Sequence, residues 1–145
     1  MAEPTPDTPT PDTELARVVS LLGEIGEIGE ADSESVVVQV ATTRASVRVV
    51  ELAEGLDVIS VTQLVALNLP NTDTLRDDVE KLGAGVSFGS LRRSDPVGAT
   101  TDVLLYYTFP LGGLTDIALL TVLHIVLGTG ADVGARLAGV NDDRG

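Results

Sequence analysis

The sequence predicts a single α+β domain, built from an antiparallel five-stranded sheet flanked by helices in the order α-β-β-β-α-β-β-α. Apolar residues recur at helical spacing in three separate stretches, and β-branched or aromatic residues gather between them. Turn-forming residues separate these stretches at short intervals. The 145 residues suffice for one hydrophobic core and are too few for two.

The two ends of the chain differ from its middle. Residues 1–12 alternate proline, threonine and acidic residues and hold almost nothing apolar to bury, so we expect a disordered leader there. The domain is expected to span residues 13–138, followed by a flexible tail at residues 139–145. The leader lacks the basic region and apolar run of a secretory signal, which predicts a cytoplasmic protein.

The first helix is predicted to begin beside Asp12 or Thr13, whose side chains can cap it. Leu15 and Val18 then open an apolar stripe at helical spacing. Glycine recurs at every third position within residues 23–30, so we expect the helix to fray or to become a loop there.

Three consecutive strands are predicted next, because β-branched residues, mostly valine, dominate from Ser35 onward. The breaks at Thr42–Arg44 and Glu54–Gly55 are expected turns, so the strands form a meander. Pro70 ends this stretch, since proline disfavours continued strand pairing.

A short second helix is predicted because Leu75, Val79 and Leu82 lie on one helical face. Asn71 or Thr72 can cap its first turn.

Two further strands are predicted at Val86/Phe88 and Val103–Phe109, with the segment RRSDPVG as the turn between them. Arg92 and Arg93 form a pair of adjacent basic residues in this turn. At the tip of a hairpin they are a possible contact for an acidic partner, although a solvated turn is the simpler interpretation.

The third helix is predicted over Ile117–Leu127 and is expected to end at Gly128 and Gly130. Its apolar run covers only 11 residues, which is too short to span a bilayer.

Apolar side chains cover more of this helix than one sheet face can bury. The surplus predicts a surface for a partner protein or for a second copy of the chain, formed by Ile117, Leu120, Leu123, His124 and Leu127. The alternative is that the chain after Gly130 folds back and covers the helix.

The charge of the chain limits its partners. A net charge of −13 repels phosphates and anionic lipids, so neither nucleic acid nor a membrane surface is an expected partner. The absence of cysteine excludes disulfides, thiolate metal sites and cysteine nucleophiles.

The sequence offers little catalytic chemistry. His124 is the single imidazole, and it lies among aliphatic residues of a predicted helix, so a serine triad is not expected. Asp73 and Asp77 share a helical face but lack the spacing of a calcium loop. We therefore expect no catalytic residues, no metal and no cofactor, and a protein that is not an enzyme.

The segments ALNLPN at Ala66–Asn71, GAGVSFGSLRR at Gly83–Arg93 and LLYYTFPLGGLT at Leu104–Thr115 stand in an order of elements that resembles the type III secretion chaperone-like superfamily. Within it, the chain is similar to the bacterial YbjN-type proteins, over about Thr13 to Leu137. The resemblance implies a twisted antiparallel sheet flanked by helices, usually dimeric, that holds a protein segment and has no catalytic apparatus. The YbjN-type relatives are tied to general stress or regulatory roles.

The sequence therefore predicts a non-catalytic protein-binding domain, chaperone-like or regulatory, that forms a homodimer. The alternative is a small-ligand-sensing domain or a small enzyme with a pocket between the sheet and the helices.

Overall fold

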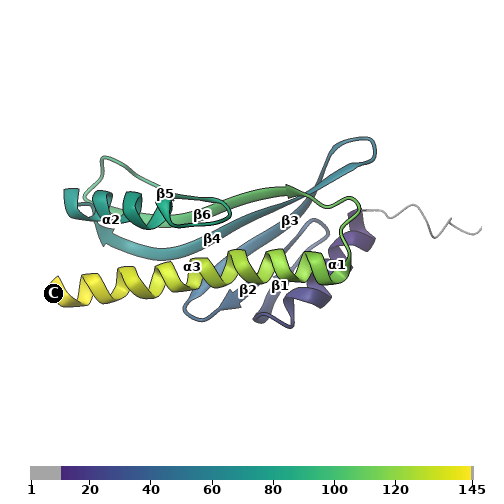
Figure 1. Cartoon of the computed structure of the whole chain (residues 1–145), viewed down its shortest axis with the longest axis horizontal. Helices are drawn as coiled ribbons and strands as arrows, with labels where there is room; N and C mark the ends of the chain where they lie inside the picture. The colour runs from purple at the N-terminus through teal and green to yellow at the C-terminus, as the bar shows by residue number, and fades with distance from the viewer. Residues whose placement is uncertain (1–10, 145) are drawn as a thin grey trace, which may run out of the picture.

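The computed structural model describes the backbone of residues 11–144 and the side chains of residues 13–139. It is an α+β fold in the order α-β-β-β-β-α-β-β-α (Figure 1). The elements are α1 (Pro11–Leu22), β1 (Glu27–Ala31), β2 (Ser35–Val40), β3 (Thr43–Ala53), β4 (Leu56–Pro70), α2 (Asp73–Ala84), β5 (Ser90–Arg93), β6 (Thr100–Pro110) and α3 (Asp116–Arg144). The predicted fold class is confirmed, with six strands in place of five.

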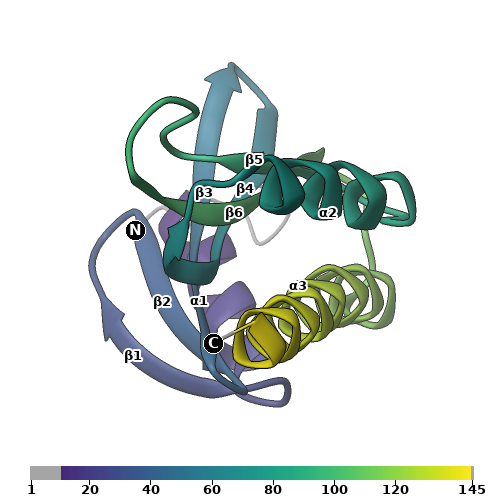
Figure 2. The same ribbon diagram turned by 90° about the vertical axis from the view of Figure 1, so that its left-hand side faces the viewer.

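The sheet is antiparallel throughout, in the order β1-β2-β3-β4-β6-β5, so β1 and β5 are its edges. Figure 2 shows α2 and α3 on the same side of the sheet. Buried leucines and valines of α1 join the same core, so one face carries all three helices. Antiparallel sheets can leave their second face in water.

Strand β1 is the element that the sequence did not predict. Glu27–Ala31 pairs with β2, with Ile28 opposite Val38. The glycines that weaken a helix here allow close pairing instead: a Cβ on Gly26 would lie 2.3 Å from the carbonyl oxygen of Gln39. Partial burial of Ile28 against the core then favours the strand.

Strand β5 also differs from its prediction. It comprises Ser90–Arg93, whereas Val86 and Phe88 precede it in the loop after α2. Phe88 packs on Tyr107 of β6, with ring centroids 5.5 Å apart, so its apolar character serves the core and not strand pairing. Helix α2 begins as predicted, because the Thr72 hydroxyl accepts a hydrogen bond from the amide of Leu75.

Helix α3 does not end at Gly128 or Gly130, as predicted, but continues to Arg144. Gly130 and Gly134 lie where the helix meets the sheet most closely. A Cβ on Gly130 would lie 2.0 Å from Oε1 of Gln63, and one on Gly134 would lie 2.8 Å from the carbonyl oxygen of Val65. These glycines therefore serve close helix–sheet packing and not helix termination.

The greater length of α3 overturns the expectation that its apolar stretch is too short to span a bilayer. From Asp116 to Gly139 the helix is long and apolar enough to cross a membrane by length and composition, a criterion that core helices of soluble proteins also meet. In the structure α3 lies along the sheet, and Leu119, Leu123 and Leu127 are fully buried there. The helix thus belongs to the core of the domain.

The structure describes only part of the predicted leader and of the predicted C-terminal tail. Residues 1–10 of the predicted leader lie outside the described residues, while Pro11 and Asp12 already belong to α1. Residues 139–144 continue α3, where a flexible tail was expected.

Candidate functional site

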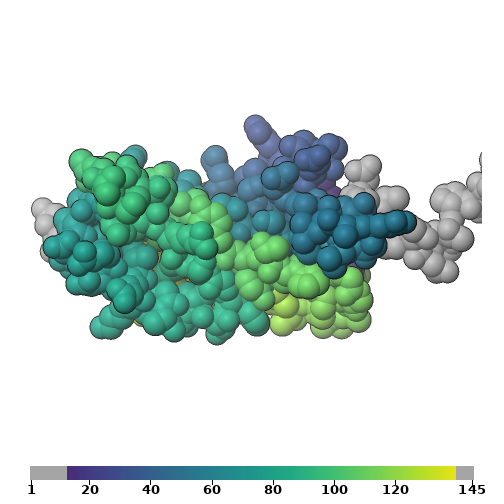
Figure 3. Space-filling model, turned by 90° about the horizontal axis from the view of Figure 1, so that it is seen from above, coloured from purple at the N-terminus to yellow at the C-terminus, as the bar shows by residue number. Residues whose placement is uncertain are grey.

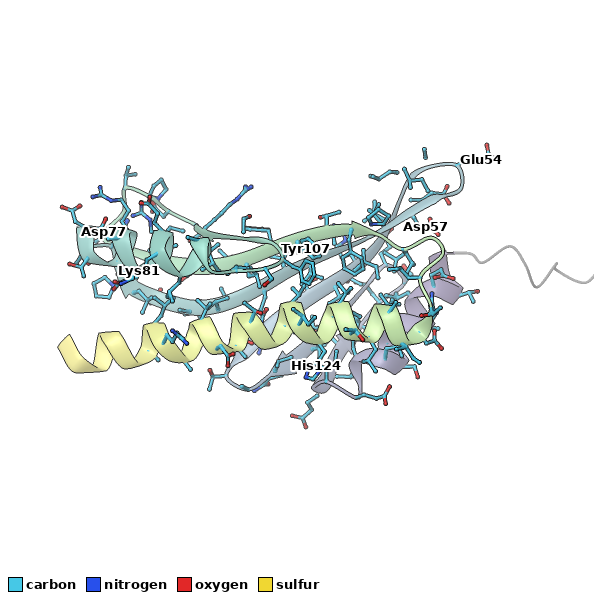
Figure 4. All side chains as sticks on the ribbon, in the orientation of Figure 1. Glu54, Asp57, Asp77, Lys81, Tyr107 and His124 are labelled. Atoms are coloured by element: carbon cyan, nitrogen blue, oxygen red, sulfur yellow. The ribbon has the colours of Figure 1, made fainter. Side chains whose placement is uncertain are left out.

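The structure divides the predicted partner surface on α3. Ile117 is 79% exposed, His124 is exposed and Leu120 is half-buried, whereas Leu123 and Leu127 are fully buried. Figure 4 shows His124 on the side of α3 that faces away from Tyr107 and β6. Leu123 and Leu127 therefore belong to the core, and their assignment to an exposed surface is wrong.

The reason lies in which side of the helix meets the sheet. The residues that α3 presents to the sheet are Leu119, Leu123, Val126, Leu127, Gly130, Val133, Gly134 and Leu137. The outward side keeps Ile117 and Ile125 as its exposed large apolar residues, with Ile125 at 41%. The chain after Gly130 does not fold back over this outward strip, because it continues as helix.

Arg92 and Arg93 lie in strand β5 and not at a hairpin tip, which corrects their predicted location. The guanidinium of Arg92 lies 5.3 Å from the centre of the Tyr106 ring on β6. Nη1 of Arg93 donates a 2.6 Å hydrogen bond to Oδ1 of Asn71.

The contact of Arg93 is structural. Nδ2 of Asn71 donates to the carbonyl oxygens of Asp95 and Gly98, both at 2.9 Å, so Arg93 and Asn71 together hold the loop before β6. Arg92, by contrast, is exposed and free to meet a partner.

A groove lies between α2 and the edge strand β5. Its volume is about 410 Å³, and Val79 and Gly83 of α2 face Leu91 of β5 across it. Three arginines line it, namely Arg76, Arg92 and Arg93, together with Glu80. Figure 3 shows α2 and β5 at one end of the upper surface, opposite the β3–β4 hairpin.

The backbone of β5 is open along this groove. The amide of Ser94 donates to the carbonyl oxygen of Asp102 on β6 at 2.9 Å. Backbone groups of alternate residues point to opposite sides of a strand, so the N–H and C=O groups of Leu91 and Arg93 point away from β6. Because β5 is an edge strand, these groups lie along the unpaired edge of the sheet.

The electrostatics of the groove differ from those of the whole chain. Arg76 forms ion pairs at 3.5 Å with Asp73 and at 3.7 Å with Asp77, but its side chain is 55% exposed, so both pairs are weak. Three arginines against one glutamate line the groove of a protein whose net charge is −13. The groove therefore favours an acidic ligand, against the sign of the charge of the whole chain.

The described residues show no cluster of side chains that could hold a metal ion. Within residues 13–139, no group of three or more histidine, aspartate or glutamate side chains is placed to hold a metal ion. Asp73 and Asp77 both lie against Arg76, which competes with a cation for their carboxylates. The absence of enzymatic activity and of a cofactor stays a prediction.

Sequence reasoning singled out Arg92 but missed the groove around it. The missing members are Arg76 and Gly83, which belong to α2, the helix that precedes β5 in the chain. Their only signal was the small residue Gly83 on the apolar face of α2 next to Leu82, which permits close approach to Leu91.

No protein-family model matches the chain, and no curated protein matches it significantly in sequence. Among solved structures, the chain is similar to YbjN from E. coli, for which a role as a transcription regulator has been suggested. The TM-score is 0.53, the sequence identity is 10%, and the match covers 85% of this chain and 93% of the other. At this identity the likeness concerns the fold alone, and the chain therefore has a YbjN-type fold.

Proposed function

We propose that the protein is a non-catalytic, chaperone-like or regulatory domain that binds an extended, acidic segment of another protein. The observation that supports this most is the groove of Arg76, Arg92 and Arg93 beside the open backbone of β5. An extended segment can pair with Leu91 and Arg93 as an added strand. Acidic side chains on one side of the added strand then meet Arg92, and those on the other side meet Arg76 of α2.

Proteins often protect an edge strand by covering it, shortening it or placing charges on it. Strand β5 is only four residues long and carries two arginines, which discourages pairing with other β5 edges. The same charges favour pairing with an acidic strand. Specificity for acidic segments therefore follows from the features that protect the edge.

The groove is tested with a labelled peptide of alternating valine and glutamate, and a matched peptide of alternating valine and lysine. The glutamate peptide should bind in a fluorescence anisotropy titration, and Arg92→Glu should weaken it by roughly tenfold. Arg136→Glu, an exposed charge reversal on α3, is the matched control and should leave the affinity unchanged.

The strand-addition geometry has its own control. N-methylation of the glutamate peptide at alternate residues removes the backbone donors that would pair with β5. Equal binding by the methylated peptide would contradict strand addition, and equal binding by the lysine peptide would contradict the role of the arginines.

Homodimerisation belongs to the same proposal. It is supported by the outward strip of α3, where Ile117 and Ile125 are exposed beside half-buried Leu120. Light scattering should give twice the chain mass, and Ile117→Glu with Ile125→Glu should give a folded monomer. A charge at Leu123, which the sequence placed on this surface, would not test the dimer. Leu123 is fully buried, so Leu123→Asp would unfold the chain itself.

A cytoplasmic location, and a partner that is neither nucleic acid nor a membrane surface, complete the proposal. The exclusion of these two classes of partner rests on the net charge of −13. The burial of Leu119, Leu123 and Val126 against the sheet supports a water-soluble fold for α3.

A further inference from the structure

The second face of the sheet carries none of the three described helices. The face is defined here as the open face, and its central outward residues are Arg44, Ser46 and Arg48 of β3, Ser60, Thr62 and Leu64 of β4, Leu104, Tyr106 and Thr108 of β6, and Arg92 of β5. Neighbouring residues in these strands point to the opposite side, where they are buried under the helices.

The open face has an uncharged strip along β4 and β6. The register places Leu64 beside Leu104 and Thr62 beside Tyr106, followed by Ser60 beside Thr108. Leu64 and Leu104 are half-buried, and Tyr106 is 36% exposed. The small hydroxyl residues permit close approach, while the leucines and the tyrosine supply apolar contact area.

Arginines border this strip on both sides. Arg44 lies opposite Leu64 on β3, and Arg92 lies opposite Leu104 on β5, so the four residues form one row across the sheet. Three steps between neighbouring strands separate the two arginines, which is about 14 Å. Arg48 lies four residues along β3 from Arg44, on the same side of the strip.

These dimensions fit an α-helix laid along β4 and β6. A helix with its side chains is about 10–12 Å wide, so it fits between Arg44 and Arg92. The backbone groups of β4 and β6 are already paired within the sheet, so this face offers side chains and not strand pairing. A helix, whose own backbone is satisfied, is the element that suits such a surface.

The charges decide what kind of helix fits. Among the described residues Arg44 has no ion pair, and Arg92 contacts the Tyr106 ring. Arg48 has an exposed ion pair with Glu34 at 3.3 Å, and Asp102 accepts a hydrogen bond from the amide of Asn68. The open face therefore offers free cationic groups on both sides of an uncharged strip.

We propose that the open face binds an amphipathic α-helix of a partner protein, with its apolar stripe on Leu64, Leu104 and Tyr106 and acidic residues on both flanks. The acidic flanks pair with Arg44 and Arg48 on one side and with Arg92 on the other. This surface goes beyond the β5 groove, because it binds a helix through side chains, whereas the groove binds an extended segment through backbone pairing.

The probe is a designed helical peptide of about 18 residues, or about 27 Å, with a leucine stripe and glutamate flanks. A second peptide has the same stripe and lysine flanks. Fluorescence anisotropy should show binding of the glutamate peptide only. Arg44→Glu combined with Arg48→Glu should weaken it at least about tenfold, and thermal melting should show that this variant is folded.

Arg76→Glu is the matched control, because Arg76 lines the groove and lies off the open face. It should change the affinity for the helical peptide by less than about twofold. Conversely, the Arg44/Arg48 variant should bind the extended valine–glutamate peptide as wild type does, so the failure of one surface is distinguishable from the failure of the other.

A second variant, Thr62→Glu, places a negative charge in the strip itself and should also weaken the helical peptide. The inference is overturned by absence of binding, by equal binding of the lysine peptide, or by unchanged affinity of these variants. It is also overturned if single-stranded DNA, and not the acidic helix, binds the face and depends on Arg44.

Discussion

At the scale of single residues, the side chain of Gln63 joins helix α3 to the sheet. Its side chain is fully buried, and Nε2 donates to Oγ1 of Thr43 at 2.8 Å and to the carbonyl oxygen of Leu127 at 3.0 Å. Oε1 has no conventional hydrogen-bond partner, and it faces the Cα of Gly130. A weak Cα–H···O contact is the compensation that this geometry allows.

Gly130→Ala should destabilise the protein by about 1–3 kcal/mol, because the new methyl group would displace the Gln63 amide from its hydrogen bonds. Gly128→Ala is the control on the same helix, because nothing lies within 4 Å of its Cβ position. It should stabilise the helix by up to about 1 kcal/mol. Urea unfolding measures both, and equal effects would contradict the role of Gly130 in packing.

Asp95 organises the loop between β5 and β6. Oδ1 accepts hydrogen bonds from the amides of Val97 at 3.0 Å and Gly98 at 2.9 Å, and these bonds lower the pKa of Asp95. A lowered pKa in the folded state means that the carboxylate stabilises the fold above the unfolded pKa of about 3.9. This contribution is lost as the pH falls through the folded value.

Asp95→Asn should therefore destabilise the protein near neutral pH, and its difference from wild type should shrink as the pH falls below about 4. Urea unfolding from pH 7 to pH 3 measures this. A difference that stays constant with pH would show that the charge of Asp95 does not stabilise the loop. Asp32, whose pKa is lowered by the amides of Glu34 and Ser35, retains its own acid dependence in both proteins.

At the scale of elements, Arg17 connects α1 to the start of α3. Nε donates to Oδ1 of Asp116, Nη2 donates to the carbonyl oxygen of Leu114, and Nη1 lies 3.2 Å from Oε2 of Glu14. The side chain of Arg17 is 26% exposed. The contacts with Asp116 and Glu14 raise the pKa of Arg17. Together with the bond to Leu114 they tie the middle of α1 to the start of α3.

Arg17→Met should lower the free energy of unfolding by about 1 kcal/mol, because it removes several charge-assisted hydrogen bonds at a partly buried place. Arg48→Met is the control, since the Arg48–Glu34 pair has side chains that are 53% and 70% exposed. Such pairs contribute little, so this change should cost at most a few tenths of a kcal/mol. Thermal denaturation compares the two, and a larger effect for Arg48→Met would contradict the α1–α3 contact.

The elements predicted best are those with local signals. β2, β3, β4 and α2 follow from valine-rich runs, turn residues and a threonine cap, and these were expected at nearly their observed positions. β1 and the C-terminal half of α3 were missed because glycine disfavours both by local propensity. In each case a glycine packs closely against a neighbouring strand, a contact that exists only in the assembled fold, and this contact decides which element forms.

The candidate site was predictable only in part for the same reason. Arg92 was visible as half of a basic pair, but the strand pairing that places it over Tyr106 is tertiary. On α3 the apolar arc was broad, and the sequence does not say which side meets the sheet. Leu123 was therefore assigned to a surface, whereas it lies in the core.

At the scale of the whole molecule, acidic residues outnumber basic ones by 22 to 9. Three of the basic residues, Arg44, Arg48 and Arg92, lie on the open face. The excess acidic side chains repel one another, and this repulsion destabilises the compact state at low ionic strength.

Raising NaCl from about 20 mM to about 200 mM should therefore raise the melting temperature by a few degrees, because salt screens this repulsion. Differential scanning calorimetry measures the shift. A fall in the melting temperature would show that attractive pairs, such as Arg17 with Asp116, outweigh the repulsion.

The two borders of the sheet carry opposite charges: β1 has Glu27 and Glu30, and β5 has Arg92 and Arg93. Like borders repel each other, so two molecules are not expected to join β1 to β1 or β5 to β5. A β1 border meeting a β5 border is electrostatically favoured, and such a head-to-tail pair keeps one free β1 border and one free β5 border. The net charge of −13 keeps the molecules apart at low ionic strength, so concentrated solutions with enough salt to screen this repulsion should favour linear chains of molecules whose sheets continue from one to the next.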